Sequence, residues 1–428
     1  MKLFSSLPYK FIPLDGTLDP ASPVLSFIVK ATFALENQRL PIALPAKDQA
    51  EFAGDEMYMD EIGRSLRYSS DLVMFKPFGE VLVTANAHAP NGHSATSVDV
   101  ALNIGHITKK LRVFGDRVWL RDTQGQFVVE GPAPFKQMPL RWERAFGGLN
   151  FTHNPMGRGI EPWTAEDGRK LFYLANIEAP HDPIHSLDQR PPPECFAPIS
   201  PQWQPRFGRE GTRDQHWATF VAPLPPRDYD PSVAQAAPQD QWLKGYWKGD
   251  ERIELVNMHP EHPNFVTALP GTRLRFFLEG HFKGSKDVEF GEVPLHLDTV
   301  HIDMTTARMH MTWRRRYHPR QAGAPELESA YLAEESLADE PAPLEAHYED
   351  FLELKGPEPE SRSAKLLRDE QAAVAEARKT LVDGKMDPSI IARFDAAPDS
   401  QAKFEMMMDL MQKKTAELEA MTAALKPN

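Results

Sequence analysis

Residues 144–159, RAFGGLNFTHNPMGRG, combine residue types that could bind a phosphate or build a tight active-site turn. The stretch holds four glycines, two arginines, two asparagines and a proline in sixteen positions. It lacks the Gly-Lys-Ser/Thr end of a P-loop and the G-x-G-x-x-G spacing of a dinucleotide site, and no G-x-S-x-G elbow occurs in the chain. We expect the glycines to permit positive φ in tight turns, with Arg144 and Arg158 tying those turns to carbonyls or carboxylates. A role in contacting a ligand or partner is the alternative.

Histidine pairs offer the other candidate chemistry. Four pairs have a spacing that metal sites use: His181 and His185, His259 and His262, His296 and Asp298, and His301 and Asp303. Prolines surround the first two pairs, and the last two are the kind of residues that exposed strand faces carry routinely. Cys195 has no activating base in its sequence neighbourhood, so we expect a buried thiol. The sequence therefore predicts no catalytic residue, no cofactor and no metal ligand.

Strand-like alternation dominates the segments that must position these residues. One face of residues 25–35 is apolar and the other polar: Leu25, Phe27, Val29, Phe33 and Leu35 against Ser26, Lys30 and Thr32. This pattern predicts a half-buried strand, and residues 97–105 repeat it. Hairpins are predicted at residues 111–121, turning at Gly115 and Asp116, and within residues 295–318. We expect a mainly β fold, an antiparallel sandwich or barrel-like body.

Residues 180–270 are rich in proline but keep their aromatic residues. Sixteen of these 91 positions are proline, about three times the usual share of roughly 5%. Interior prolines exclude long helices, whereas a disordered linker would be poor in aromatic residues. We therefore expect ordered, irregular chain over the β body.

The chain beyond the β body changes in charge and in period. Residues 326–360 hold twelve acidic residues and one basic residue, which accounts for −11 of the net charge of −13. We predict a β-rich domain over residues 1–320, an acidic solvated linker over 321–360, and a helical region over 361–428. Its helices are expected at 363–384, after Asp387-Pro388, and at about 400–426. A possible partner-binding face of the last helix comprises Phe404, Met407, Met411, Leu418, Met421 and Leu425, interrupted by Lys414.

Composition excludes several classes of protein. One cysteine rules out a disulfide framework and a multi-cysteine zinc site. An acidic chain whose excess charge lies in one run is a poor nucleic-acid binder. No window approaches eighteen apolar residues, and the N-terminal MKLFSSLPYKFIPL lacks a signal-peptide pattern. We expect a cytoplasmic protein without a membrane span.

Several motifs together resemble the bacterial family DUF2169. RAFGG (144–148) and NPMGRG (154–159) are followed by LANIEAP (174–180), RPPPECFAPISPQWQPR (190–206), GTRDQHWATFVAPLPPRDYD (211–230), AAPQDQ (236–241), KGDERIELVNMHPEHP (248–263) and ALPG (268–271). Arg213, where the family often has tyrosine, and Met156 are mild departures. The signature positions, which either build the fold or bind a partner, are Arg144, Phe146, Gly147, Gly148, Asn154, Pro155, Gly157, Arg158 and Gly159.

The resemblance implies a binding protein rather than an enzyme. Proteins of this family are similar to adaptors, or effector chaperones, that bind a type VI secretion effector in the cytoplasm and help to load it onto a VgrG or PAAR spike component. The C-terminal helices lie outside the resemblance, and we expect them to be a second binding element. Two alternatives stay open: a carbohydrate-binding protein or enzyme on a β-sandwich, with the aromatic residues of 203–247 stacking on sugars, and a structural component secreted with the spike.

Overall fold

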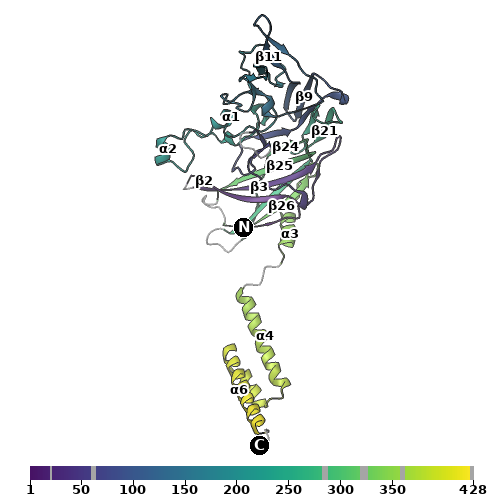
Figure 1. Ribbon diagram of the computed structural model, residues 1–428. Helices are drawn as coiled ribbons and strands as arrows, with labels where there is room; N and C mark the ends of the chain where they lie inside the picture. Colours follow the sequence, from purple (N-terminus) through teal and green to yellow (C-terminus); the bar gives the residue numbers. More distant parts are fainter. Residues whose placement is uncertain (20–21, 59–63, 282–287, 319–325, 357–361, 425–428) are drawn as a thin grey trace. The chain divides into compact units, whose positions relative to one another are not determined.

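The computed structural model describes residues 1–19, 22–58, 64–281, 288–318, 326–356 and 362–424. The chain divides into two compact units, Met1–Leu354 and Lys355–Asn428. Strands dominate the first unit, and the second unit is helical (Figure 1). The expected mainly β fold with a C-terminal helical region is confirmed.

A seven-stranded sheet is the centre of the first unit. Its strands are β2 (Lys10–Asp19), β3 (Ser22–Ala34), β4 (Ile42–Ala43), β7 (Gly79–Thr84), β19 (Trp242–Leu243), β24 (His296–Asp303) and β25 (Arg308–Tyr317). Their order is β19-β7-β24-β25-β3-β2, with β4 paired to β3. β24 and β25 form the antiparallel hairpin predicted within residues 295–318. The prediction succeeds because both strands alternate, with Ile302 and Met309 among the buried apolar side chains.

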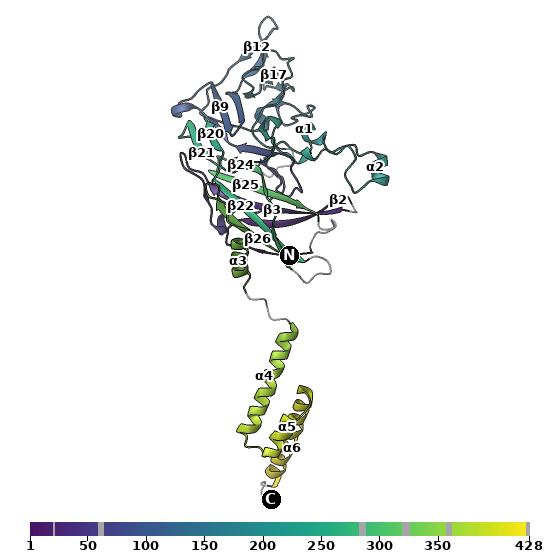
Figure 2. The ribbon, with the colours of Figure 1, turned by 180° about the vertical axis from the view of Figure 1, so that it is seen from behind.

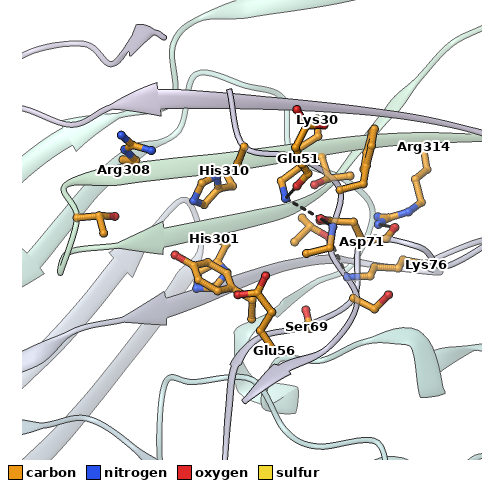
Figure 3. Close-up of a pocket in the computed structure, with 18 residues that line it drawn as sticks. Lys30, Glu51, Glu56, Ser69, Asp71, Lys76, His301, Arg308, His310 and Arg314 are labelled. Atoms are coloured by element: carbon orange, nitrogen blue, oxygen red, sulfur yellow. Dashed lines mark hydrogen bonds and ion pairs between the residues drawn. The ribbon is translucent and has the colours of Figure 1, made fainter. Parts of the chain in front are cut away.

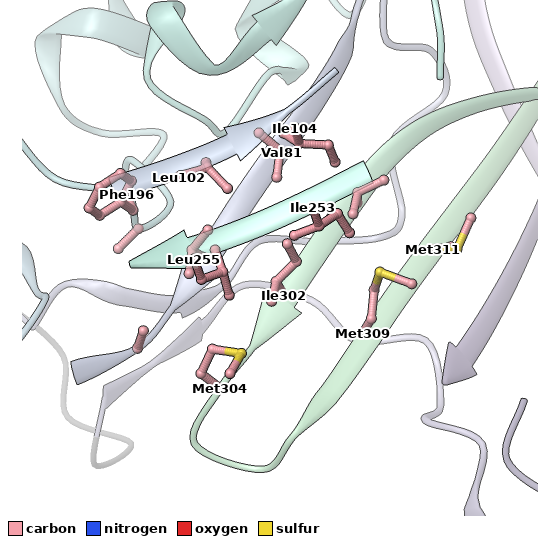
Figure 4. Packing of buried hydrophobic residues seen from close by; sticks show 14 of the residues in the cluster. Val81, Leu102, Ile104, Phe196, Ile253, Leu255, Ile302, Met304, Met309 and Met311 are labelled. Carbon is pink, nitrogen blue, oxygen red and sulfur yellow. The ribbon is translucent and has the colours of Figure 1, made fainter. Parts of the chain in front are cut away.

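Two further sheets pack on one face of this sheet. The five-stranded sheet contains β18 (Ile177–Glu178), β10 (Ile107–Phe114), β9 (Ser97–Ile104), β20 (Arg252–Val256) and β21 (Asn264–Ala268). The four-stranded sheet contains β1 (Lys2–Phe4), β26 (Glu326–Ser336), β22 (Thr272–His281) and β23 (Val288–Glu292). One hydrophobic cluster joins the three sheets, and Figure 4 shows Ile302 of β24 beside Ile253 and Leu255 of β20. The first unit is therefore a sandwich.

The second face of the seven-stranded sheet is also buried. Ser26 and Thr32 of β3 have no exposed surface, and Lys30 is 7% exposed. The prediction of a half-buried strand at residues 25–35 is therefore wrong for the polar face. A cover segment, residues 44–58 and 64–76, lies on that face. The Gln49 side-chain amide accepts from the backbone N–H of Thr32 and donates to its C=O. Polar side chains here are satisfied inside the protein instead of by water.

The hairpin predicted at residues 111–121 is not formed. β10 pairs with β9 and β18, whereas β11 (Val118–Arg121) pairs with β12 (Phe127–Glu130) and β17 (Lys170–Tyr173) in another sheet, which β16 (Trp163–Thr164) completes. Asp116, at the expected turn, bonds instead to Asn176 and two arginines from distant segments. Three two-stranded sheets complete the unit: β5 (Glu56–Met57) with β6 (Leu66–Tyr68), β8 (Asn86–His88) with β13 (Gln137–Pro139), and β14 (Phe146–Gly147) with β15 (Arg158–Gly159).

The proline-rich region is ordered and irregular, as predicted. Its two helices are short, α1 (Gln204–Phe207) and α2 (Gln215–Phe220). Side chains hold the chain where regular pairing is missing: the buried Arg206 guanidinium donates to the carbonyls of Ile199 and Val233, both at 2.9 Å. Gln241 likewise donates to the carbonyls of Val81 and Phe196. The Arg206 bonds tie parts of this region to one another, and the bond from Gln241 to Val81 fastens the region to β7 of the seven-stranded sheet.

The prediction of a solvated linker over residues 321–360 is wrong for most of the stretch. Residues 326–336 form β26, and residues 344–355 form the helix α3 (Leu344–Lys355), which lies next to β26 in both views (Figures 1 and 2). Tyr331 of β26 and Phe351 of α3 are buried in one cluster with Phe4 and Phe277. The high acidic count concealed this apolar content, and one of the carboxylates, Glu335 of β26, is itself only 12% exposed and pairs with Arg275 and His347.

The three helices of the second unit lie where helices were predicted. It contains α4 (Arg362–Asp383), α5 (Pro388–Asp395) and α6 (Ser400–Ala424). Asp387 caps α5 by accepting a hydrogen bond from the backbone N–H of Ser389, with Pro388 at the first helical position. α6 contacts both α4 and α5.

Candidate functional site

The signature loop, residues 144–159, is held together by the side chain of Asn154. This asparagine is fully buried, and its Nδ2 donates to the carbonyls of Trp142 at 2.8 Å and Phe146 at 3.0 Å. The backbone carbonyl of Asn154 accepts from the backbone N–H groups of Gly148 and Gly157. Asn154 therefore fixes both arms of the loop, which pair as the parallel strands β14 and β15.

The glycines of the loop are needed mainly for close packing. Only Gly159 has a positive φ, +124°, so the expectation of positive φ holds for that residue alone. A Cβ on Gly147 would lie 2.1 Å from the Asn154 carbonyl oxygen, and one on Gly148 would lie 2.0 Å from Glu161 Oε2. A Cβ on Gly157 would meet the Asn154 amide at 2.5 Å. The arms approach so closely that Gly147 and Gly157 have no room for a side chain, whereas a Cβ on Gly148 would meet only the movable end of the Glu161 side chain.

Asp116 joins both arginines of the loop. Its Oδ1 accepts from Arg144 Nη1 at 2.9 Å, from Arg158 Nη1 at 3.2 Å and from Asn176 Nδ2 at 3.0 Å. Burial alone would raise the pKa of Asp116, but the Asn176 hydrogen bond and the two arginine charges lower it below its usual range. Arg158 Nε also donates to the carbonyl of Glu143. These contacts match the predicted tie between arginines, carboxylates and carbonyls.

Within the described chain, the signature residues thus contact one another. Phe146 is buried and packs edge-on against Phe151, with ring centroids 5.6 Å apart, and Pro155 is half-buried beside Asn154. The exposed tip of the loop contains Leu149, which is 75% exposed. The geometry favours a fold-determining role for the signature, and a partner contact through its tip stays a prediction.

A polar pocket of about 350 Å³ lies between the buried polar face of the seven-stranded sheet and the cover segment (Figure 3). Lys30 Nζ is 2.6 Å from Asp71 Oδ2, and the buried Lys76 and Arg314 pair with Glu80 and Asp298. Arg314 also donates to the carbonyls of Asp71 and Val73. These three cations are already neutralised, so they offer no free charge to a ligand.

Two histidines on the wall of this pocket are held neutral. His301 Nε2 is 2.8 Å from Thr84 Oγ1, and His310 Nδ1 is 3.2 Å from Thr32 Oγ1. Burial, followed by the charge of His310, lowers the pKa of His301 to about 3. Burial, followed by the charge of Lys30, lowers the pKa of His310 to about 4. Neutral imidazoles can donate or accept one more hydrogen bond each, so they could orient a small polar molecule.

The sequence placed His301 and Asp303 on an exposed strand face, which is wrong. They are 5% and 0% exposed, and the Asp303 carboxylate accepts from Tyr68 and from Thr305. Among the described residues, no group of three or more His, Cys, Asp or Glu side chains is arranged to hold a metal ion. Cys195 is fully buried, and burial raises the pKa of its thiol to about 12, so it does not form a thiolate at neutral pH.

The apolar face of α6 differs by one position from the predicted face. Met407 is half-buried, whereas Phe404, Met408 and Met411 are 38%, 59% and 61% exposed. Phe404, Met408 and Met411 thus form an exposed i, i+4, i+7 face. The side chains of Leu418 and Met421 lie outside the described part, as does residue Leu425 altogether. A groove beside this face is lined by Glu370, Gln401, Phe404, Glu405, Met408, Asp409 and Gln412.

Several aromatic residues proposed to stack on sugars face inward. Trp203 and Trp247 are 6% and 5% exposed, and the Trp242 indole donates to the carbonyl of Ala237. Phe207 and Phe220 are exposed, on the two short helices. This packing leaves the carbohydrate alternative with little aromatic surface.

One of the comparisons with known proteins identifies a family. The model of DUF2169, described as an uncharacterized protein conserved in bacteria, matches residues 21–314. No curated protein and no solved structure matches the chain. Among the described helices, none is both long enough and apolar enough to cross a membrane.

Proposed function

Because this chain belongs to the DUF2169 family, we propose that it is a non-enzymatic adaptor, or effector chaperone. It binds a type VI secretion effector in the bacterial cytoplasm and assists the loading of that effector onto a VgrG or PAAR spike component. The ordered series of motifs from RAFGG to ALPG supports this role, since it resembles adaptors of that kind. The two other roles considered from the sequence gain no comparable support.

The observation that carries the proposal is the apolar surface of the helical unit. Phe404, Met408 and Met411 lie on successive turns of α6 and remain accessible. They do so although α4 and α5, in the same unit, could bury apolar side chains. Methionine side chains are flexible and polarisable, so such a face adapts to the shape of a partner. Amphipathic helices commonly bind partners in this way. The β body and the helical unit thus provide two separate contact regions.

We expect Met408→Gln with Met411→Gln to weaken capture of the effector encoded next to this protein. Glutamine keeps the side-chain length and the helix propensity but removes the apolar contact. Losing two such contacts at an interface costs about 1–2 kcal/mol each, which corresponds to roughly a 30-fold to 1000-fold weaker complex. Pull-down titration of the co-expressed effector measures the change.

The matched control is Lys413→Gln with Glu417→Gln, because both positions are exposed on the same helix. This variant should capture the effector like the unmodified protein. Equal capture by all three proteins would show that α6 is not the contact surface. If the unmodified protein itself captures no effector, the adaptor function is wrong.

A further inference from the structure

A second, smaller pocket at the end of the β24–β25 hairpin has a different electrostatic character. Its volume is about 260 Å³, and its walls come from residues 74–76, Tyr246, the start of β24 and the end of β25. Six of its side chains are basic or imidazole groups: Lys76, His296, Arg314, Arg315, Arg316 and His318. The carboxylate in its wall is Asp298, which is bound by Arg314.

Two positive charges remain in this pocket after pairing. Lys76 is paired with Glu80, and Arg314 with Asp298. In the described part of the chain, no carboxylate lies within ion-pair distance of Arg315 or Arg316. The whole chain carries a net charge of −13, so the positive charge of this pocket is opposite in sign to the net charge of the protein.

Aromatic and imidazole contacts hold the two guanidinium groups in place. The guanidinium carbon of Arg316 lies 4.5 Å from the centre of the Phe75 ring. Arg315 Nη1 lies 3.3 Å from His296 Nε2, and the His296 ring stacks on Tyr246 at 4.3 Å with 12° between the planes. Tyr246 is fixed in turn, since its hydroxyl donates to the carbonyl of Lys76 at 3.0 Å.

His296 accepts a hydrogen bond from Arg315 and does not neutralise its charge. Burial and then the charge of Arg315 lower the pKa of His296, so its imidazole is neutral and Nε2 accepts the Arg315 hydrogen bond. Arg315 keeps further N–H groups for another acceptor, since a guanidinium has five. Preorganised arginines bind carboxylates with a smaller loss of side-chain entropy than mobile ones.

We propose that this pocket binds the carboxylates of an acidic polypeptide segment through Arg315 and Arg316. Met74, Phe75 and Tyr246 in the wall suit the methylene groups of glutamate side chains. A nucleic acid fits less well, because its many phosphates would face an acidic protein that offers two unpaired arginines here. The inference concerns a surface of the β body and holds whether or not the partner is a secretion effector.

The test is fluorescence anisotropy of a labelled, amidated peptide containing four consecutive glutamates, against the same peptide with four glutamines. The full-length protein should bind the glutamate peptide at 50 mM salt, and much more weakly at 500 mM. Arg315→Gln with Arg316→Gln should weaken this binding at least tenfold. Arg227→Gln with Arg252→Gln, which removes two exposed arginines elsewhere, should leave it unchanged.

Three results would overturn the inference. The first is that the glutamine peptide binds as tightly as the glutamate peptide. The second is that the Arg315/Arg316 variant binds the glutamate peptide as tightly as the unmodified protein does. A hexathymidylate that binds more tightly than the glutamate peptide, through the same two arginines, would assign the pocket to nucleic acid instead. Tryptophan fluorescence of each variant checks that the β body is folded, because all eight tryptophans lie in Met1–Leu354.

Discussion

Gly147→Ala should destabilise the β body by about 3 kcal/mol, the upper part of the range for overpacked sites. The new Cβ would lie 2.1 Å from the Asn154 carbonyl oxygen, a backbone atom that cannot rotate away. Asn154 in turn bonds to the carbonyls of Trp142 and Phe146, so moving it disturbs both arms of the signature loop. Urea unfolding followed by tryptophan fluorescence measures the loss.

Gly54→Ala is the matched control, because a Cβ there meets nothing within 4 Å. Its unfolding midpoint should stay close to that of the unmodified protein. The larger Gly147→Val should further reduce the yield of folded protein. If Gly147→Ala unfolds normally but no longer captures its partner, the signature loop is a contact surface and the fold-determining assignment is wrong.

Lowering the pH from 7 to 5 should cost the β body about 4 kcal/mol, about 2 kcal/mol from each of His301 and His310. Their pKa values are lowered to about 3 and about 4 in the folded protein, against 6.5 for a free histidine. Below about pH 6.5 the unfolded chain therefore binds protons that the folded chain does not. Stability is full above that pH and falls as the pH decreases toward 4.

The neighbouring charged groups do not cause this loss of stability between pH 7 and pH 5. Asp303, which faces both rings, has a lowered pKa, so its stabilisation is lost only in more acidic solution than pH 5. The positive charges of Lys30 and Arg67 lower the pKa of His301, and that of Lys30 also lowers the pKa of His310. Urea unfolding at pH 7 and at pH 5 measures this loss in the free energy of unfolding, for the unmodified protein and for the variants below.

His310→Gln should remove about half of the pH dependence, whereas His93→Gln, at an exposed position, should leave it unchanged. A β body equally stable at pH 7 and pH 5 would show that the two imidazoles are not buried as described. It would also contradict the neutral state of the two imidazoles in the wall of the polar pocket.

Local alternation made much of the fold predictable. The β24–β25 hairpin and the strand β9 follow from apolar residues at every second position, and Asp387-Pro388 places the start of α5. Long-range contacts were not predictable from local pattern. Gly115-Asp116 has the composition of a hairpin turn, yet Asp116 is bound by Arg144, Arg158 and Asn176.

The sites were partly predictable for the same reason. The signature loop is contiguous, so its residues could be named from the sequence. The polar pocket joins Lys30, Asp71 and His301 from distant segments. Regular polar positions in β3, β24 and β25 were a signal for it, but an exposed face gives the same alternation. Only the cover segment, which carries Gln49, decides that the face is buried.

The most direct test of the central claim is co-expression with the product of the adjacent gene, affinity capture through this chain and mass determination of the eluted species. The adaptor function predicts a stoichiometric complex and a neighbour that is insoluble when expressed alone. Elution of this chain by itself, with a neighbour that is equally soluble without it, would contradict the proposed function.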